Sequence, residues 1–346
     1  MTLYTWDSWI VTRRSARMGD EAPWLLAALT DAGEGLSDRL AAGFHHDRAF
    51  LSLWETRDFR RFSCVSSRIF SADAEGSDNG GIWSGCVVDA RRVTPTGGER
   101  EGLFLFYTSR DLRHMSDGRL AEQKIYGAWL PRGASWDAWE RVSGFALGHD
   151  VVPDAAGVQD AASPEVTPMA WRDPSVFFWD GALWMVVSAK GTTGTPNSRG
   201  AVVFLRSPSS DLLSWTPAGL LVPPPGHRCG EMEVPRVCRD GQGELWLTYA
   251  TGGNALRDAR PRPEAPSGEL HALRFACSGH EVMSAQEHRV LVSADDPIYA
   301  AWIAPNGDVV GFHATEGGFR NVGRPPLDLI PVASGGGHFR ARLRSS

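Results

Sequence analysis

The sequence of 346 residues has few cysteines, no long apolar run and no excess of positive charge. Its five cysteines are widely spaced, odd in number and without CxxC pairs, so we predict reduced thiols in preference to a disulfide framework or a zinc site. The net charge of −6 provides neither the basic field that nucleic acids require nor a polybasic membrane patch. A neutral, polyhydroxylated substrate is compatible with this charge, as are many other ligands.

The N-terminal region also lacks the features of an export signal. Residues 1–9 contain no basic stretch followed by an apolar segment, and no part of the chain approaches the roughly 20 apolar residues that a membrane span needs. We therefore expect a cytoplasmic protein that does not contact a membrane. A secreted protein whose leader has been removed would look the same.

Helical periodicity is scarce in this sequence. The best helix candidate is Ala22–Ala42, which Gly33 and Gly35 interrupt. The remainder is dominated by short apolar runs bounded by turn residues, which is typical of β-strands. The clearest of these runs are Ala49–Trp54, Gly102–Thr108, Ser175–Trp179, Leu183–Ser188, Ala201–Leu205, Leu245–Ala250, Leu270–Phe275 and Val309–His313.

The strand-like runs recur in a loosely repeated order. Asp-Gly turns at 180–181 and 240–243 predict hairpins, because glycine adopts the positive φ that tight turns require. Repeated four-stranded units of this kind predict the blades of a β-propeller, with a β-sandwich carrying long loops as the alternative. The loop-rich stretches Asp150–Pro168 and Ala255–Gly268 have similar strand units on both sides. We therefore predict a single domain, residues 1–346.

Three motifs place a carboxylate beside an aromatic residue, a proline or a second acid. They are Trp6–Trp9 (Trp-Asp-Ser-Trp), Trp171–Pro174 (Trp-Arg-Asp-Pro) and Glu231–Pro235 (Glu-Met-Glu-Val-Pro). The inner strands of a propeller converge on its axis, so acids from distant positions in the sequence can meet in one funnel. Glycoside cleavage needs one carboxylate as a nucleophile and a protonated carboxylic acid for the leaving oxygen. A third carboxylate can stabilise the oxocarbenium-like transition state.

The acid of such a pair must hold its proton near neutral pH. Burial and a nearby like charge both raise the pKa of a carboxyl group, and Glu231 is two residues away from Glu233. Residues two apart in a strand face the same side. We therefore expect Glu231 and Glu233 to point into the funnel, with Met232 facing away.

Taken together and in order, these motifs resemble those of the clan of five-bladed β-propeller glycosidases that contains levansucrases, inulosucrases and invertases. The resemblance is closest to the levansucrase family, glycoside hydrolase family 68. That family has its nucleophile in Trp-Asp-Ser-Trp, a transition-state stabiliser in Arg-Asp-Pro and its acid/base in Glu-x-Glu-Arg-Pro. Its fourth element, Trp-Ser-Gly, stands here as Trp83–Gly85. Val234 replaces the arginine of the third motif.

The resemblance implies an all-β fold, a single five-bladed β-propeller with a central funnel-shaped active site. It implies that Asp7 is the nucleophile of a covalent fructosyl intermediate, that Glu233 is the acid/base, and that Asp173 binds sugar hydroxyls and stabilises the transition state. It also implies two groups of substrate-binding residues. These are Trp6, Trp83 and Ser84 at the furanose, and Arg172 and Glu231 at the leaving group or acceptor.

Neither a metal nor a phosphate site is expected. The adjacent side chains of His45–Asp47 (His-His-Asp) would diverge on a strand, and the glycines at 191–194 and 252–253 have no lysine at P-loop spacing. We therefore expect no cofactor, and the expected partner is a small carbohydrate. The sequence gives no indication of the oligomeric state.

Several functional readings stay open. The first is a retaining hydrolase or fructosyltransferase, for which Asp7 and Glu233 should lie roughly 5 Å apart, and the second is an inverting, arabinofuranosidase-like enzyme with roughly 6.5–9.5 Å between them. A transferase that decorates a secondary metabolite and a non-catalytic sugar-binding propeller are the others. The family's arginine for the glucosyl half of sucrose has no counterpart in residues 248–254, so the donor sugar is not identified.

Overall fold

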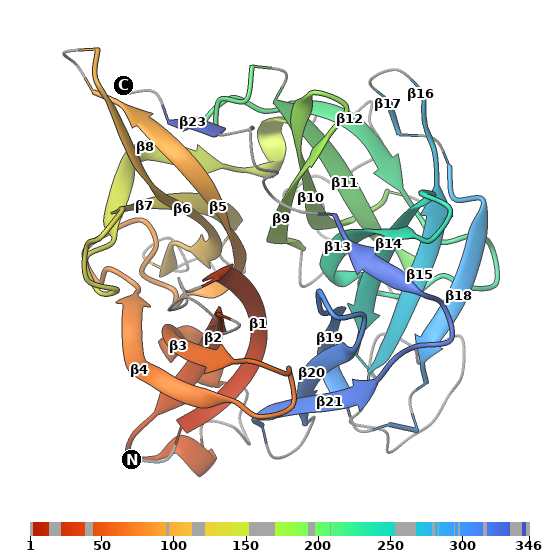
Figure 1. Ribbon diagram of the computed structural model, residues 1–346, viewed down its shortest axis with the longest axis horizontal. Coiled ribbons are helices and arrows are strands. Elements are labelled where there is room, and N and C mark those ends of the chain that lie inside the picture. Colours follow the sequence, from red (N-terminus) through yellow and green to blue (C-terminus); the bar gives the residue numbers. More distant parts are fainter. Residues whose placement is uncertain are drawn as a thin grey trace.

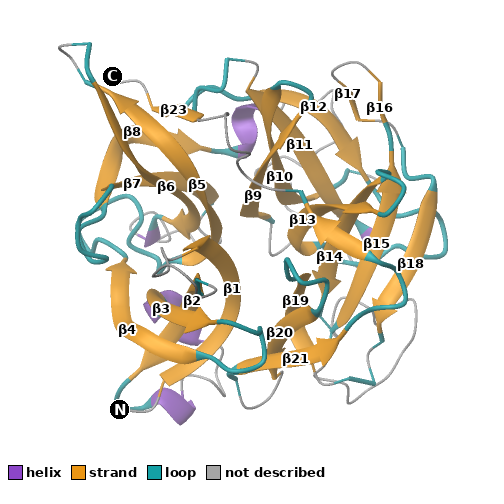
Figure 2. Ribbon diagram, in the orientation of Figure 1, coloured by secondary structure: helices purple, strands orange, loops and turns teal. Residues whose placement is uncertain are grey.

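The structure, a computed structural model, consists almost entirely of β-strands with very little helix (Figure 2). None of the helices in the described part of the chain is long and apolar enough to cross a membrane. The described residues are 3–13, 22–38, 44–94, 97–112, 122–151, 170–192, 198–207, 209–252, 268–278, 281–282, 284–293, 295–296, 298–313, 317–332 and 341–343. Most of the two loop-rich stretches predicted around residues 150–168 and 255–268 therefore lies outside the described residues.

Five antiparallel sheets surround a common axis, and each sheet is one blade of a β-propeller (Figure 1). Blade I contains β1 (Leu3–Arg13), β2 (Trp24–Ala32), β3 (Phe50–Thr56) and β4 (Ser63–Ser71), and blade II contains β5 (Trp83–Val93), β6 (Glu99–Arg110), β7 (Gln123–Pro131) and β8 (Glu140–Leu147). Blade III contains β9 (Trp171–Trp179), β10 (Ala182–Lys190), β11 (Gly200–Ser207) and β12 (Thr216–Leu221).

Blades IV and V complete the ring. Blade IV contains β13 (Glu233–Asp240), β14 (Leu245–Thr251), β15 (Glu269–Phe275) and β18 (Glu287–Val292), and blade V contains β19 (Ile298–Ile303), β20 (Val309–His313) and β21 (Phe319–Gly323). The remaining elements are η1 (Phe44–Arg48), η3 (His149–Val151), β16 (Cys277–Ser278), β17 (Glu281–Val282), β22 (Leu329–Pro331) and β23 (Ala341–Leu343). The predicted five-bladed propeller is therefore confirmed, and each of the eight predicted strands coincides with an observed one.

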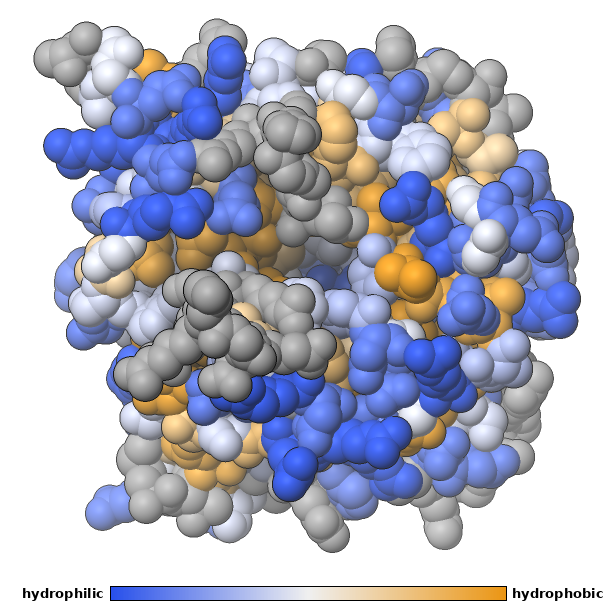
Figure 3. Space-filling model, in the orientation of Figure 1, coloured by the Kyte–Doolittle hydropathy of each residue, from blue (hydrophilic) through white to orange (hydrophobic). Residues whose placement is uncertain are grey.

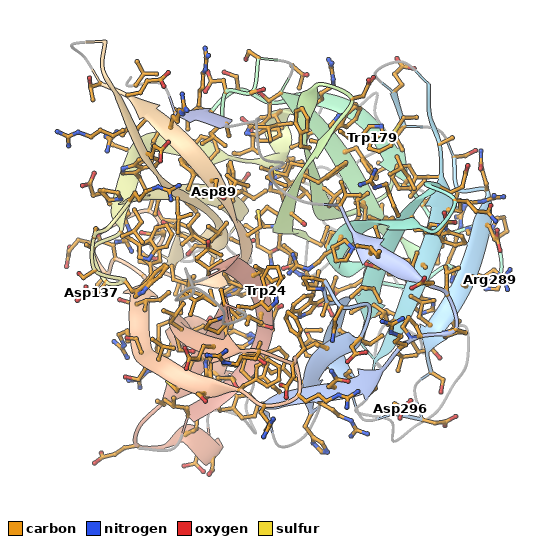
Figure 4. All side chains as sticks on the ribbon, in the orientation of Figure 1. Trp24, Asp89, Asp137, Trp179, Arg289 and Asp296 are labelled. Carbon is orange, nitrogen blue, oxygen red and sulfur yellow. The ribbon has the colours of Figure 1, made fainter. Side chains whose placement is uncertain are left out.

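The strands β1, β5, β9, β13 and β19 are the innermost of their blades and pack against one another around the axis (Figure 1). The space-filling view shows a hollow near the middle of the same face (Figure 3). Exposed charged residues such as Asp137 and Arg289 lie instead at opposite outer edges of the molecule (Figure 4). The inner strands thus present their side chains to a shared central space.

The hydrophobic core is divided among the boundaries between neighbouring blades. Each blade is covered on both faces, because a cluster of buried apolar side chains lies between each pair of adjacent blades. Phe106 of blade II, for example, contacts Trp215, which follows β11 in blade III, with ring centroids 5.9 Å apart. Burial on two faces explains why the strands appear in the sequence as nearly continuous apolar runs.

The predicted helix at Ala22–Ala42 is wrong over residues 24–32. Trp24–Ala32 forms β2, the second strand of blade I, whereas residues 36–38 are helical and residues 39–42 lie outside the described residues. The seven residues between the ends of β2 are all buried, because both faces of the strand are covered. Leu25 and Leu29 pack towards blade II, whereas Leu26 packs towards blade V. An apolar run buried on both faces carries no period-2 alternation, so its sequence pattern did not distinguish a strand from a helix.

Candidate active site

Every inner strand is irregular where it passes the centre of the propeller. The antiparallel register is interrupted at Trp6-Asp7, Ser84, Asp173-Pro174, Val234-Pro235 and Ala300-Ala301. Such bulges leave extra residues unpaired and redirect their side chains. The two prolines fit these positions because a bulge does not need their missing N–H groups. The predicted motifs are therefore located on bulges that surround the axis.

Asp7 has a conformation that is rare for a residue with a side chain. Its φ is 74°, and its carboxylate is buried, with the residue 2% exposed. The Ser84 hydroxyl from blade II donates a hydrogen bond to Asp7 Oδ2. Asp7 Oδ1 has no hydrogen-bond partner among the described residues. One oxygen is thus fixed and the other is free to react.

Asp173 also has a positive φ, 59°, and is held from three sides. Its Oδ2 accepts a hydrogen bond of 3.0 Å from the backbone N–H of Val234, and its own N–H donates to Thr108 Oγ1 at 3.0 Å. Arg172 Nε lies 3.6 Å from the same Oδ2. Asp173 is therefore held by three blades, through its backbone N–H by blade II and through its carboxylate by blades III and IV.

Arg172 joins the two glutamates of the third motif. Its Nη2 lies 2.5 Å from Glu231 Oε2 and 2.9 Å from Glu233 Oε1. Lys190 Nζ, from the end of β10, lies 3.4 Å from Glu231 Oε1. Met232 is completely buried in the core between blades III and IV. Glu231 and Glu233 thus face the centre together while Met232 faces away, as predicted, but Glu231 lies in the segment before β13 and not in the strand itself.

Burial strongly affects the proton affinity of these acids. The pKa of Asp7 is raised to about 8: desolvation is the largest cause and the charges of Asp173 and Glu233 act in the same direction, while Ser84 and Arg236 oppose them. Desolvation also raises the pKa of Asp173. Coupled acids of this kind titrate together, so the protons held near neutral pH belong to the set of carboxyl groups and not to one residue alone.

The two glutamates shift in opposite directions. Burial raises the pKa of Glu233 above its ordinary range, and this effect outweighs the opposing charge of Arg172. Burial acts in the same sense on Glu231, but Arg172 and Lys190 together lower the pKa of Glu231 below its usual value. Glu231 is therefore suited to remain ionised, and Glu233 is suited to hold a proton, which is the property that a general acid needs.

Aromatic rings form one wall beside the nucleophile. Trp6 packs edge-on against His46 with centroids 5.5 Å apart, and the His46 ring is 5.7 Å from that of Trp83. Trp83 Nε1 donates a hydrogen bond of 3.2 Å to the backbone carbonyl of His46. Burial lowers the pKa of His46 to about 3, with His45 and Arg110 adding to the effect. His46 is therefore a neutral imidazole in this wall.

The sequence reasoning missed several residues that the structure places here. Tyr299, from blade V, donates a hydrogen bond of 3.3 Å to Glu233 Oε2. Thr108 of β6, Lys190 of β10 and His46 of η1 join the site from elements outside the three acid motifs. A signal was available for Tyr299, because Tyr-Ala-Ala-Trp at 299–302 has the aromatic-x-x-Trp spacing of Trp6–Trp9.

The structure therefore brings together all eight residues singled out in the sequence. Ser84 contacts Asp7, and Arg172 contacts Asp173, Glu231 and Glu233. The charges of Asp173 and Glu233 act on Asp7, and Trp6 and Trp83 line the adjacent wall. Within the described residues, no group of three or more His, Cys, Asp or Glu side chains is arranged to hold a metal ion. The arrangement can supply a carboxylate nucleophile, a protonated carboxylic acid and a third carboxylate from three different blades.

Comparisons with known proteins give the family and the fold. The family described as "Glycosyl hydrolases family 32 N-terminal domain" matches residues 42–243. No curated protein matches the chain in sequence. The resemblance to the clan of propeller glycosidases is thus confirmed, and the family that matches is 32, not family 68, which the sequence motifs predicted.

Solved structures share the fold at low sequence identity. A levansucrase variant from B. megaterium has a TM-score of 0.53 and 12% identity, with 96% of this chain and 84% of that chain covered. A family 32 glycoside hydrolase from Bifidobacterium adolescentis has a TM-score of 0.53 and 12% identity, with 90% of this chain and 56% of that chain covered. A fructofuranosidase from Schwanniomyces occidentalis, complexed with fructose, has a TM-score of 0.51 and 14% identity, with 90% of this chain and 58% of that chain covered.

This chain spans a little over half the length of the last two proteins. At these identities the structures establish the five-bladed propeller and not the substrate. The family match covers more than half of the chain and includes the second and third acid motifs. The chain therefore belongs to glycosyl hydrolase family 32, as a member with the family's N-terminal propeller domain.

Proposed function

We propose that this protein is a retaining glycoside hydrolase or fructosyltransferase that acts on a β-fructofuranoside through a covalent glycosyl-Asp7 intermediate. The observation that carries the proposal is the meeting of Asp7, Asp173 and Glu233 from blades I, III and IV, with Asp7 Oδ1 unpartnered and the pKa of Glu233 raised. The family and the fructofuranosidases that share the fold support a fructofuranoside as the donor.

In the first step, ionised Asp7 attacks the anomeric carbon of the furanoside through Oδ1. The bond to the leaving oxygen breaks, and protonated Glu233 transfers its proton to that oxygen. The hydrogen bond from Ser84 to Oδ2 orients the carboxylate for attack. Asp173, fixed by three blades, faces the region where positive charge develops on the sugar and stabilises it electrostatically.

In the second step, Glu233 acts as a base. It takes a proton from water or from an acceptor hydroxyl, whose oxygen attacks the anomeric carbon and releases Asp7. Glu233 is then protonated and Asp7 ionised, as at the start. The cycle needs one proton on this pair, and the hydrogen bond from Tyr299 to Glu233 Oε2 holds the acid/base in place.

The leaving group or acceptor is expected beside Glu231, Arg172 and Lys190. This trio carries two positive charges and one carboxylate that stays ionised, so it can both donate to and accept from sugar hydroxyls. Trp6 and Trp83 provide flat apolar faces that suit a furanose ring. How well an acceptor competes with water at the trio decides between hydrolysis and transfer.

The test is product analysis by NMR with sucrose as the donor and methanol as an added acceptor. We expect release of glucose and formation of methyl β-fructofuranoside with retained configuration, and loss of at least about a thousandfold in rate for Asp7→Ala, which removes the nucleophile. Asp31→Asn, another buried aspartate of blade I outside the site, is the matched control and should keep its activity.

Three outcomes would contradict the proposal in different ways. Inverted product configuration would replace the covalent mechanism with direct attack by water. Full activity in Asp7→Ala would remove Asp7 from the chemistry. If sucrose binds but neither it nor other β-fructofuranosides are cleaved, the protein is a sugar-binding propeller.

A further inference from the structure

Arg236 lies next to the site but has no part in the proposed reaction steps. It is located on β13 three residues beyond Glu233, and its half-buried side chain reaches across to blades I and V. Its Nη2 donates a hydrogen bond of 3.1 Å to the backbone carbonyl of Ser8. Its guanidinium carbon lies 5.6 Å from the centre of the Trp302 ring. Arg236 therefore connects three blades at the axis.

The contact with Ser8 lies in the backbone next to the nucleophile. Ser8 directly follows Asp7, whose φ of 74° is strained for a residue with a side chain. Trp302 Nε1 donates to Ser8 Oγ at 3.3 Å, so Ser8 is held through both its carbonyl and its hydroxyl. Strain of this kind persists only where surrounding contacts fix the chain. Arg236 and Trp302 supply those contacts.

The charge of Arg236 also acts on the Asp7 carboxylate. Asp173 from β9 and Glu233 from β13 are negative and favour the protonated form of Asp7, whereas Ser84 from β5 and Arg236 favour the ionised form. The hydroxyl of Tyr299 from β19 also interacts electrostatically with Asp7. A nucleophile surrounded by like charges needs such a counter-charge to lose its proton.

The environment of Arg236 is consistent with this role. Burial lowers the pKa of Arg236, while the charge of Asp7 is the strongest effect that raises it, followed by Cys86, Cys238 and Asp173. An arginine remains positively charged even so, because its guanidinium is not deprotonated in proteins. Removing one of two opposite charges at a buried site leaves the other charge less well compensated.

We propose that Arg236 is the positioning residue of the nucleophile: it holds the Ser8 carbonyl and supplies a positive charge that lowers the proton affinity of Asp7, which favours the ionised form that attacks. The inference rests on the proposed function, in which Asp7 is the nucleophile. It predicts that loss of Arg236 raises the proton affinity of Asp7, with the fold preserved.

A direct test follows the Asp7 proton without any substrate. Infrared difference spectra, recorded from pH 5 to pH 10, follow the C=O band of the protonated carboxyl group that Asp7→Asn abolishes. In Arg236→Met we expect the midpoint of this band to rise by about one pH unit, a tenfold gain in proton affinity. Arg236→Lys, which keeps the charge, should stay closer to the native midpoint.

Arg239→Met is the matched control on the same strand. Its guanidinium carbon lies 5.8 Å from the Trp179 ring, so it also has a cation–π contact but is exposed and remote from Asp7. This variant should leave the Asp7 midpoint unchanged. If Arg236→Met fails to fold, Arg236→Gln, which keeps a donor for the Ser8 carbonyl without the charge, replaces it in the same comparison.

Kinetics provide a second readout where a donor is cleaved. The acidic limb of the pH profile of kcat/KM should move to higher pH in Arg236→Met, whereas a purely structural role would lower kcat/KM equally at all pH values. An unmoved infrared midpoint in folded Arg236→Met would overturn the inference. Failure to cleave any furanoside would instead count against the proposed function, and the infrared result would still decide the role of Arg236.

Discussion

At the scale of single residues, the buried carboxyl group of Asp7 links activity to stability. Its pKa is raised to about 8 by burial, so the folded chain binds this proton more tightly than the unfolded chain does. As pH rises from about 4 to about 8, the unfolded chain loses the proton while the folded chain keeps it. The contribution of Asp7 to folding therefore becomes less favourable throughout this range.

Asp7→Asn should remove this penalty. We expect the variant to gain stability relative to the native protein as pH rises from 4 to 8, by up to roughly 5 kcal/mol at about 1.4 kcal/mol per pKa unit. Urea denaturation at pH 4, 6 and 8 gives the free energy of unfolding at each pH. Asp89→Asn, at an exposed position of β5, controls for the loss of one negative charge. A difference that is the same at all three pH values would contradict the prediction.

The residues of the site divide into those that a sequence motif could reveal and those that it could not. Asp7, Asp173 and Glu233 stood out because each lies in a short pattern with a tryptophan, a proline or a second acid. Lys190 follows an ordinary apolar strand, and its contact with Glu231 depends on how blades III and IV are placed. Such contacts are set by the tertiary structure, and one sequence does not contain them.

At the scale of elements, the strands were predictable and their bulges were not. The apolar runs marked the strands because each blade is buried on two faces. The five interruptions of register at the axis have no shared residue type: the residues with positive φ include Asp7, Asp173, Val234 and Ala300. A positive φ is disfavoured for valine, so the fold imposes this conformation on Val234 against its local preference. Bulge geometry is therefore decided by the packing of inner strands.

Gly85→Ala tests the bulge of blade II. A Cβ at Gly85 would lie 2.0 Å from the Phe106 carbonyl oxygen of the neighbouring strand, so β5 would have to shift and move Ser84 away from Asp7. We expect a loss of about 1–3 kcal/mol in the free energy of unfolding. Gly241→Ala, in an open turn with no atoms within 4 Å of the added Cβ, should be nearly neutral. Equal effects of the two substitutions in urea denaturation would contradict this account.

At the scale of the whole molecule, the C-terminal region ties blades together from the inside. β22 pairs with the end of β13 in blade IV. β23 runs parallel to β5 in blade II, while Arg342 exchanges backbone hydrogen bonds of 2.8 and 2.9 Å with Ser210 and Leu212 of blade III. These short strands add to the inner edges of the blades, which closes exposed edges and links blades that are distant in the sequence.

Substitutions at two neighbouring positions of β23 test how much its side-chain packing contributes to the free energy of unfolding, apart from its backbone hydrogen bonds. Leu343 is 2% exposed and packs in the cluster between blades II and III, whereas the side chain of Arg342 is exposed. Leu343→Ala should lower the free energy of unfolding by about 2–5 kcal/mol, as expected for a cavity in a packed core. Arg342→Ala keeps the backbone hydrogen bonds and should change stability by less than about 0.5 kcal/mol. Urea denaturation of both variants checks the prediction, and a neutral Leu343→Ala would mean that the ring of blades closes without the packing of β23.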